Sequence, residues 1–261
     1  MRKFKIQLSS SIESFLIELG DMVWFTLEVI RQFFMAPFEH RELIKQSYYI
    51  GNKTLPLISI TGFIMGLVLT LQSRPVLVEF GAQNLLPGMI SVSVVREIGP
   101  VITALLCAGK ISSGIGAELG AMKVTEQLDA MEVSGTKPLN FVVATRVMAT
   151  TLLVPLLVIF ADAIALIGSF VAVRMYEDIS IVLFISRAFD SLSFTDIVPA
   201  TIKTFFFGFF IGLIGTYKGY TTGRGTESVG RSANSAVVTA SLVIFIIDLL
   251  AVQVSSLIFK V

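Results

Sequence analysis

The feature that most constrains this chain is the run from Leu55 to Gln72, 18 residues without one charged side chain. A helix of that length rises about 27 Å, close to the ~30 Å thickness of a bilayer's hydrocarbon core. Four more apolar stretches follow, at Leu85–Gly109, Leu139–Val173, Ile197–Tyr217 and Ala236–Phe259. The sequence therefore predicts an all-α integral membrane protein with five transmembrane helices.

Composition supports the same class. Hydrophobic residues make up 54% of the chain and charged residues only 15%, against about 25% charged residues in soluble domains. The formal net charge is +1, which lacks the basic excess of a nucleic-acid-binding protein. We expect no nucleic-acid partner.

The N-terminal segment, residues 9–35, spaces its apolar side chains as one face of a helix. Five charged residues interrupt it, which a membrane-spanning helix would not tolerate. An amphipathic helix in the membrane interface is the favoured interpretation, and packing on a soluble partner is the alternative. We expect an N-terminal cytoplasmic and interfacial region, 1–54, followed by one transmembrane domain, 55–261.

Two details of the spans can be read from particular residues. Pro155 lies inside the long third stretch, which predicts either one kinked helix or a helix followed by a re-entrant segment. If the N-terminus is cytoplasmic, thirteen lysines and arginines lie in cytoplasmic segments and four in outer ones. The positive-inside rule therefore predicts a cytoplasmic N-terminus and an outer C-terminus.

Glycines recur at a spacing of four in two spans. The pairs are Gly62 with Gly66 and Gly208 with Gly212. Small residues at this spacing allow two helix backbones to approach closely, so we expect these positions to pack against other helices.

The segment between the second and third spans, residues 110–138, has a helical rhythm. Ala121, Val124, Leu128 and Met131 form an apolar stripe. A short cytoplasmic helix at this place suits contact with a soluble motor, although an ordinary interfacial loop helix has the same pattern.

The run REIGPVITALLCAGKISSGIGAELGAMKVTEQLDAMEV, Arg96–Val133, resembles the signature of the MlaE/YrbE family of ABC transporter permeases. The run GYTTGRGTESVGRSANSAVV, Gly219–Val238, is similar to a second loop of that family. The resemblance covers nearly the whole chain from the interfacial helix onward.

The resemblance implies a homodimer in the bacterial inner membrane that moves phospholipid or a related lipid between that membrane and the outer envelope. It implies a cytoplasmic ABC ATPase dimer that binds ATP and Mg, and a periplasmic MCE-domain lipid-binding protein. The helix Glu118–Glu132 would couple the chain to the ATPase. Its implied coupling residues are Glu118, Met122, Lys123, Thr125, Glu126, Gln127, Asp129 and Glu132. Spans one and five, with the first glycine pair, are expected to wall a lipid cavity.

Charged residues inside spans are costly and usually face protein or a wet cavity. The set here is Arg96, Glu97, Asp162, Lys203 and Asp248. Lys203 and Asp248 lie at matching depth in adjacent spans, which predicts an ion pair. We expect Glu97 to line the lipid cavity and contact a headgroup. The alternative is that all these charges form structural pairs. Arg146 lies near a span end, where its side chain would reach the interface.

The chain has no GxxxxGK[ST] phosphate loop, so we expect no ATP binding and no enzymatic activity of its own. No cluster of metal ligands surrounds His40, the single histidine, and we expect no metal site. The main rival hypothesis is a secondary transporter driven by an ion gradient, with Asp162, Asp248 and Glu97 as proton relays.

Overall fold

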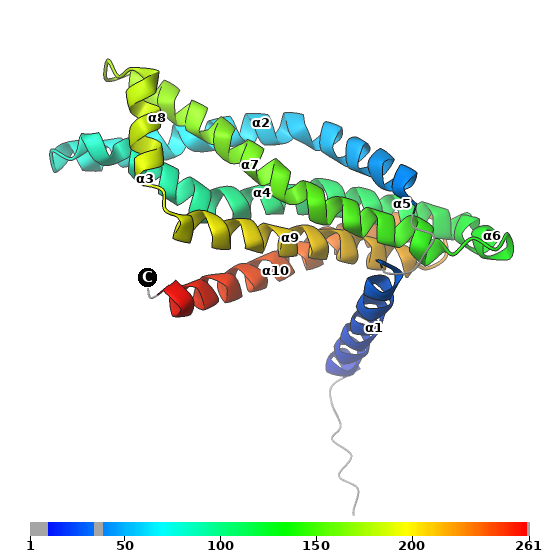
Figure 1. Ribbon diagram of the computed structural model, residues 1–261. Coiled ribbons are helices and arrows are strands. Elements are labelled where there is room, and N and C mark those ends of the chain that lie inside the picture. Colours follow the sequence, from blue (N-terminus) through cyan, green and yellow to red (C-terminus); the bar gives the residue numbers. More distant parts are fainter. Residues whose placement is uncertain (1–9, 34–38, 260–261) are drawn as a thin grey trace, which may run out of the picture.

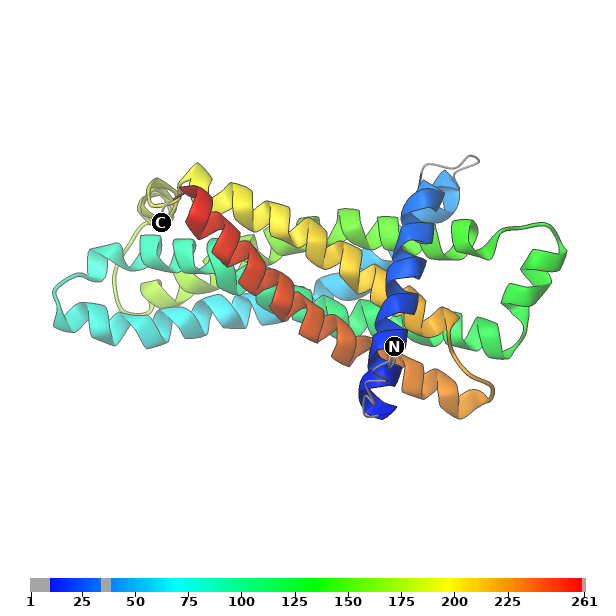
Figure 2. The same cartoon turned by 90° about the horizontal axis from the view of Figure 1, so that it is seen from below.

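The computed structural model describes residues 10–33 and 39–259, and within this part every regular element is helical. The long helices run side by side as an elongated bundle (Figures 1 and 2). The elements are α1 (Ser10–Phe33), α2 (His40–Glu79), η1 (Gln83–Leu85), α3 (Leu86–Ser93), η2 (Val94–Ile98), α4 (Gly99–Cys107), η3 (Ala108–Ser112), α5 (Ser113–Val124), α6 (Gln127–Val133), η4 (Leu139–Ala144), α7 (Thr145–Arg174), α8 (Ile181–Asp190), α9 (Phe194–Tyr220) and α10 (Thr226–Phe259).

Five helices are long and apolar enough to span a membrane, which confirms the predicted all-α membrane fold. They are His40–Glu79, Gln83–Val124, Leu139–Arg174, Phe194–Tyr220 and Thr226–Ile258. Four of them extend several residues beyond their predicted spans, because polar residues continue the helix past the apolar stretch, and the third is longer by Arg174 alone. The third span is a single helix that contains Pro155, so it includes no re-entrant segment.

The second span is a composite of α- and π-helical turns. The π segments η2 and η3 interrupt it, and η4 opens the third span in the same way. Such wide turns are rare and occur frequently at functional sites. At η2, Pro100 has no N–H to donate to the Arg96 carbonyl, and the Gly99 N–H bonds instead to Val94, five residues earlier.

The third span, mainly α7, packs between α2 and α9, and both glycine pairs pack against it. A Cβ added to Gly66 would lie 1.8 Å from the Ala165 carbonyl oxygen of α7, and one added to Gly208 would lie 2.5 Å from that of Thr150. The structure thus places the first glycine pair at a contact within the subunit. The expectation that this pair shapes a lipid cavity is wrong, because α7 fills the space beside it.

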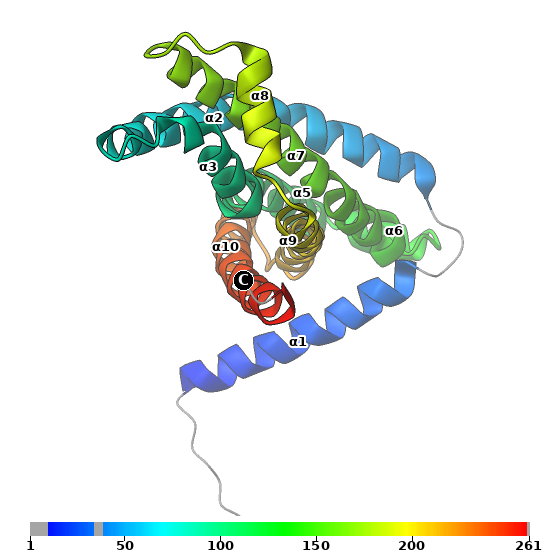
Figure 3. The same ribbon diagram turned by 60° about the vertical axis from the view of Figure 1, so that its left-hand side comes forward.

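The helix α1 is not one of the five spans and crosses one end of the bundle obliquely (Figure 3). Its Phe25 and Val29 are buried, and the Phe25 ring packs edge-on against Tyr217. Trp24 and Leu27 on its other side are exposed. This two-sided helix agrees with the predicted amphipathic interfacial helix.

The helix α8 is not among the predicted elements. It links the third and fourth spans at the end of the bundle opposite α6 (Figure 1). Its N-cap Ser180 accepts a hydrogen bond from the Leu183 N–H, and Phe184 and Ala188 are buried while Val182 and Phe189 are exposed.

Candidate functional site

Three charged side chains from three spans meet inside the bundle. The Lys203 ammonium of α9 lies 2.6 Å from Glu97 Oε2 of η2 and 2.9 Å from Asp248 Oδ1 of α10. The predicted Lys203–Asp248 pair is therefore present, with Glu97 as a third member. Lys203 is only 5% exposed while Glu97 is 41% exposed. We call Glu97, Lys203 and Asp248 the ion cluster.

The depth of the ion cluster makes it unusual. Lys203 is the tenth residue of α9, so it lies about 14 Å along the helix from its first residue. Charges at such depth cost roughly 2.5–3.5 kcal/mol each on insertion scales, and mutual pairing offsets this cost. The cluster holds two carboxylates and one ammonium, so its formal charge is negative.

A pocket of about 330 Å³ opens beside the ion cluster. Its charged lining residues are Arg96, Glu97, Asp196 and Lys203. Arg96 Nη1 lies 3.7 Å from Asp196 Oδ1, and Asp196 is held in place because it also forms the capping box of α9 with Ser193. We call this space the charged pocket. It presents both cations and carboxylates to an occupant.

The helix α10 borders the charged pocket with an apolar stripe. Exposed side chains at spacings of three and four run along it: Val238, Leu242, Phe245, Leu249 and Val252. Val252 also lines the charged pocket. Polar groups and a long apolar face are therefore adjacent, which is the combination that a lipid headgroup with its acyl chains requires.

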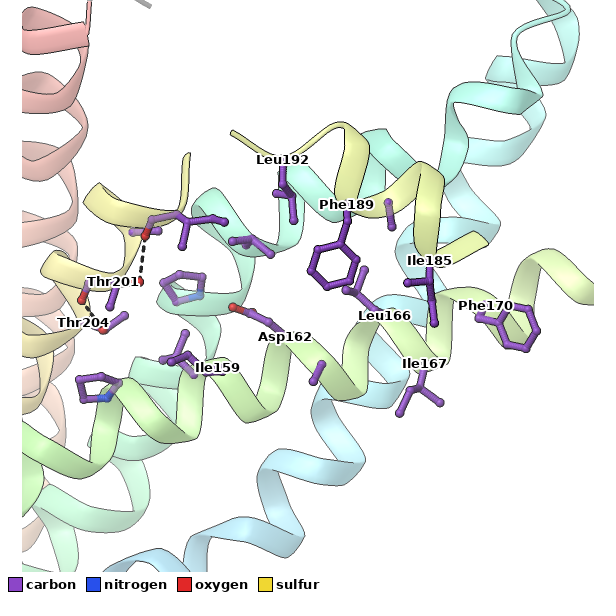
Figure 4. A pocket seen from close by; sticks show the side chains of 18 of the residues that line it. Ile159, Asp162, Leu166, Ile167, Phe170, Ile185, Phe189, Leu192, Thr201 and Thr204 are labelled. Atoms are coloured by element: carbon purple, nitrogen blue, oxygen red, sulfur yellow. Dashed lines mark hydrogen bonds between the residues drawn. The ribbon is translucent and has the colours of Figure 1, made fainter. Parts of the chain in front are cut away.

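Asp162 does not join the ion cluster. It projects from α7 into a separate apolar cavity of about 470 Å³ between α7, α8 and α9 (Figure 4). Its Oδ1 atom is buried and has no hydrogen-bond partner among the described residues. It lies against Gly99, where an added Cβ would be 1.8 Å from that oxygen. The structure thus separates Asp162 from the other charged residues predicted to act together.

The predicted coupling helix Glu118–Glu132 is not one helix. The second span continues through α5 to Val124, and the short helix α6 comprises only Gln127–Val133. Glu126 joins them with φ +58°, and a left-handed residue cannot continue an α-helix. An apolar stripe at helical spacing does not reveal a bend of this kind.

The predicted coupling residues divide into two groups. Glu118 belongs to α5 and binds the buried Arg146 at 2.8 Å, and Met122 packs against the core. Lys123 reaches across the bend to Asp129, also at 2.8 Å. An exposed set remains around the bend: Thr125, Glu126, Gln127, Asp129 and Glu132.

Sequence reasoning missed two residues of these sites. Asp196 lines the charged pocket, and the pattern Ser193-x-x-Asp196 before an apolar run is a capping-box signal that could have revealed its fixed position. Arg146 is buried and paired rather than reaching the interface as expected. Its partner Glu118 lies 28 residues away in sequence, and no local pattern indicates that contact.

Comparison with known proteins gives consistent results. The family profile described as Permease MlaE matches residues 43–254. A probable ABC transporter permease protein of Rickettsia bellii is 34% identical, over 99% of this chain and 96% of its own. The intermembrane phospholipid transport system permease protein MlaE of Haemophilus influenzae is 35% identical over 79% of each chain. This chain therefore belongs to the MlaE family of ABC transporter permeases.

Proposed function

We propose that this permease subunit moves phospholipid between the bacterial inner membrane and the outer envelope. The charged pocket carries the proposal, because it places cations and carboxylates at membrane depth beside the apolar stripe of α10. The Haemophilus relative is named for intermembrane phospholipid transport, which supports the same cargo.

The headgroup would bind in the charged pocket. Arg96 supplies a guanidinium suited to a phosphate, and Glu97 supplies a partly exposed carboxylate suited to an ammonium group. Lys203 is occupied by two carboxylates, so it holds Glu97 in position rather than binding cargo. The acyl chains would lie along the stripe of α10.

A homodimer would enclose this space. The α10 span is the least buried of the five, since only 17% of its most apolar 18 residues are buried inside the subunit. A second copy facing this helix would convert the open stripe into a cavity between two subunits.

We propose that the N-terminus is cytoplasmic, as the distribution of lysine and arginine favours. The α6 end of the bundle then faces the cytosol. The exposed side chains around the bend would dock on a separate ABC ATPase dimer, which would bind ATP and Mg. The α8 end would face the periplasm, where an MCE-domain lipid-binding protein would exchange lipid with the permease.

Reconstitution of the purified assembly into vesicles tests this function. We expect ATP-dependent phospholipid transfer that requires the partner ATPase. Glu97→Gln should reduce transfer by about tenfold or more while the subunits still copurify, since one charge-assisted contact is worth about 1.5–3 kcal/mol. Val182→Ala, on the exposed face of α8, is a control that should retain transfer.

Two results would contradict the proposal. Undiminished transfer by the Glu97→Gln assembly would remove the carboxylate from headgroup binding. Lipid transfer by this chain alone under an ion gradient, without nucleotide, would support the secondary-transporter hypothesis instead.

A further inference from the structure

A different pocket lies toward the α6 end of the bundle, between α2 and the junction of η3 with α5. Its volume is about 210 Å³, and its polar lining includes Gln46, Tyr49, Lys53, Lys110 and Glu118. We call it the two-lysine pocket. It shares no lining residue with the charged pocket.

Sequence position fixes the depth of the two-lysine pocket. Lys53 comes just before the charge-free run that begins at Leu55, and Lys110 directly follows the apolar stretch that ends at Gly109. Both lysines therefore lie where the hydrocarbon layer ends and the lipid headgroups begin. Tyr49 adds the kind of aromatic side chain that is enriched at this level.

The pocket keeps an excess of positive charge. Among the described ion pairs, neither Lys53 nor Lys110 has a carboxylate partner within 4.0 Å. The Lys53 ammonium donates to the Tyr49 hydroxyl at 2.5 Å, which leaves two of its N–H groups for other acceptors. Glu118, the one carboxylate in the lining, already binds Arg146.

The backbone leaves room for an occupant beside these lysines. A Cβ added to Gly114, which also lines the pocket, would meet nothing within 4 Å. The N-terminal part of α2 diverges from α5 at this end of the bundle (Figure 3). A small acceptor group with several oxygens would fit the donors that Lys53, Lys110 and Tyr49 present.

We propose that the two-lysine pocket binds the phosphate group of an anionic phospholipid from the adjoining leaflet. Basic pockets between membrane helices at the headgroup level recognise such lipids. Two lysines without acidic partners favour a lipid of net negative charge over a zwitterionic lipid, whose ammonium group they repel. This lipid is distinct from cargo in the charged pocket, and its binding requires no ATP.

Native mass spectrometry of the purified full-length protein, titrated with phosphatidylglycerol or phosphatidylcholine, tests the proposal. The unmodified protein should bind phosphatidylglycerol more tightly. The double variant Lys53→Gln/Lys110→Gln should lose about tenfold in affinity for phosphatidylglycerol, as expected for the loss of two lysines near a phosphate. The variant Lys53→Arg/Lys110→Arg should retain the preference, which separates lost charge from lost folding.

A matched control removes two positive charges elsewhere. Lys45 and Arg231 are 76% and 80% exposed and lie outside the pocket, so Lys45→Gln/Arg231→Gln should keep the preference. An unchanged preference in Lys53→Gln/Lys110→Gln would overturn the proposal, and so would displacement of the lipid by millimolar inorganic phosphate.

Discussion

Lys203 lies between two carboxylates, so exchanging its charge with that of Asp248 cannot fully restore the stability of the ion cluster. Removing its charge leaves Glu97 and Asp248 unpaired at depth, and breaking a buried ion pair from one side typically costs about 3–5 kcal/mol. The role of Glu97 is therefore double, because its carboxylate pairs with Lys203 and also lines the charged pocket.

We predict that exchanging the charges, Lys203→Asp with Asp248→Lys, restores stability only in part. Glu97 Oε2 now lies 2.6 Å from the Lys203 ammonium. In the double variant an aspartate would occupy position 203 beside the Glu97 carboxylate, and the two negative charges would repel each other. Adding Glu97→Gln should raise the thermal unfolding midpoint of the double variant in detergent. If the double variant already unfolds at the midpoint of the unmodified protein, Glu97 is not part of the cluster.

At the scale of single elements, the close contact between α2 and α7 depends on glycines of α2, which have no side chain to keep the two backbones apart. We predict that Gly66→Ala destabilises the protein by roughly 1–3 kcal/mol, as expected for overpacking, because the added Cβ would lie 1.8 Å from the Ala165 carbonyl oxygen. Gly230→Ala is the matched control, since its Cβ meets nothing within 4 Å. Equal thermal midpoints for the two variants would contradict this packing.

The bend between α5 and α6 depends on one left-handed residue. Glycine adopts positive φ without strain, whereas a β-branched residue does so rarely. We predict that Glu126→Gly retains more ATPase copurification than Glu126→Val. Both variants lose the carboxylate, but only valine adds about 1–3 kcal/mol of backbone strain at this positive φ. Gln127→Val, one residue later and already helical, should have the smaller effect. Equal losses for both valine variants would show that the bend is unimportant.

The sequence predicts the elements of this fold better than their contacts. Charge-free runs such as Leu55–Gln72 locate the spans because the bilayer demands them. The helix α8 escaped prediction because ten residues are too few for a span. The pairing of Glu118 with Arg146 depends on how α5 packs beside the third span, which periodicity does not encode. Matching depth did predict the Lys203–Asp248 pair, but not Glu97 as its third member.

At the scale of the whole molecule, the charged pocket and the bend between α5 and α6 lie at different levels of one bundle. The charged pocket lies within the bundle and adjoins the open stripe of α10. The bend lies at the α6 end (Figure 2). The second span connects them, since η2 carries Glu97 and α5 leads into the bend. In the proposed function, a movement of α6 on the partner ATPase would therefore reach the charged pocket through one helix.

A phospholipid that carries a photoreactive diazirine on its headgroup gives the most direct test of the headgroup site. Headgroups of the surrounding bilayer remain at its surfaces, so only a transported lipid can bring the probe to the depth of Glu97. Illumination of the complete assembly, followed by peptide mass spectrometry, should locate adducts at residues 96–100 and 199–203, which line or adjoin the charged pocket away from the first turn of α9, with fewer in Glu97→Gln. Adducts confined to the two ends of the spans would contradict the account.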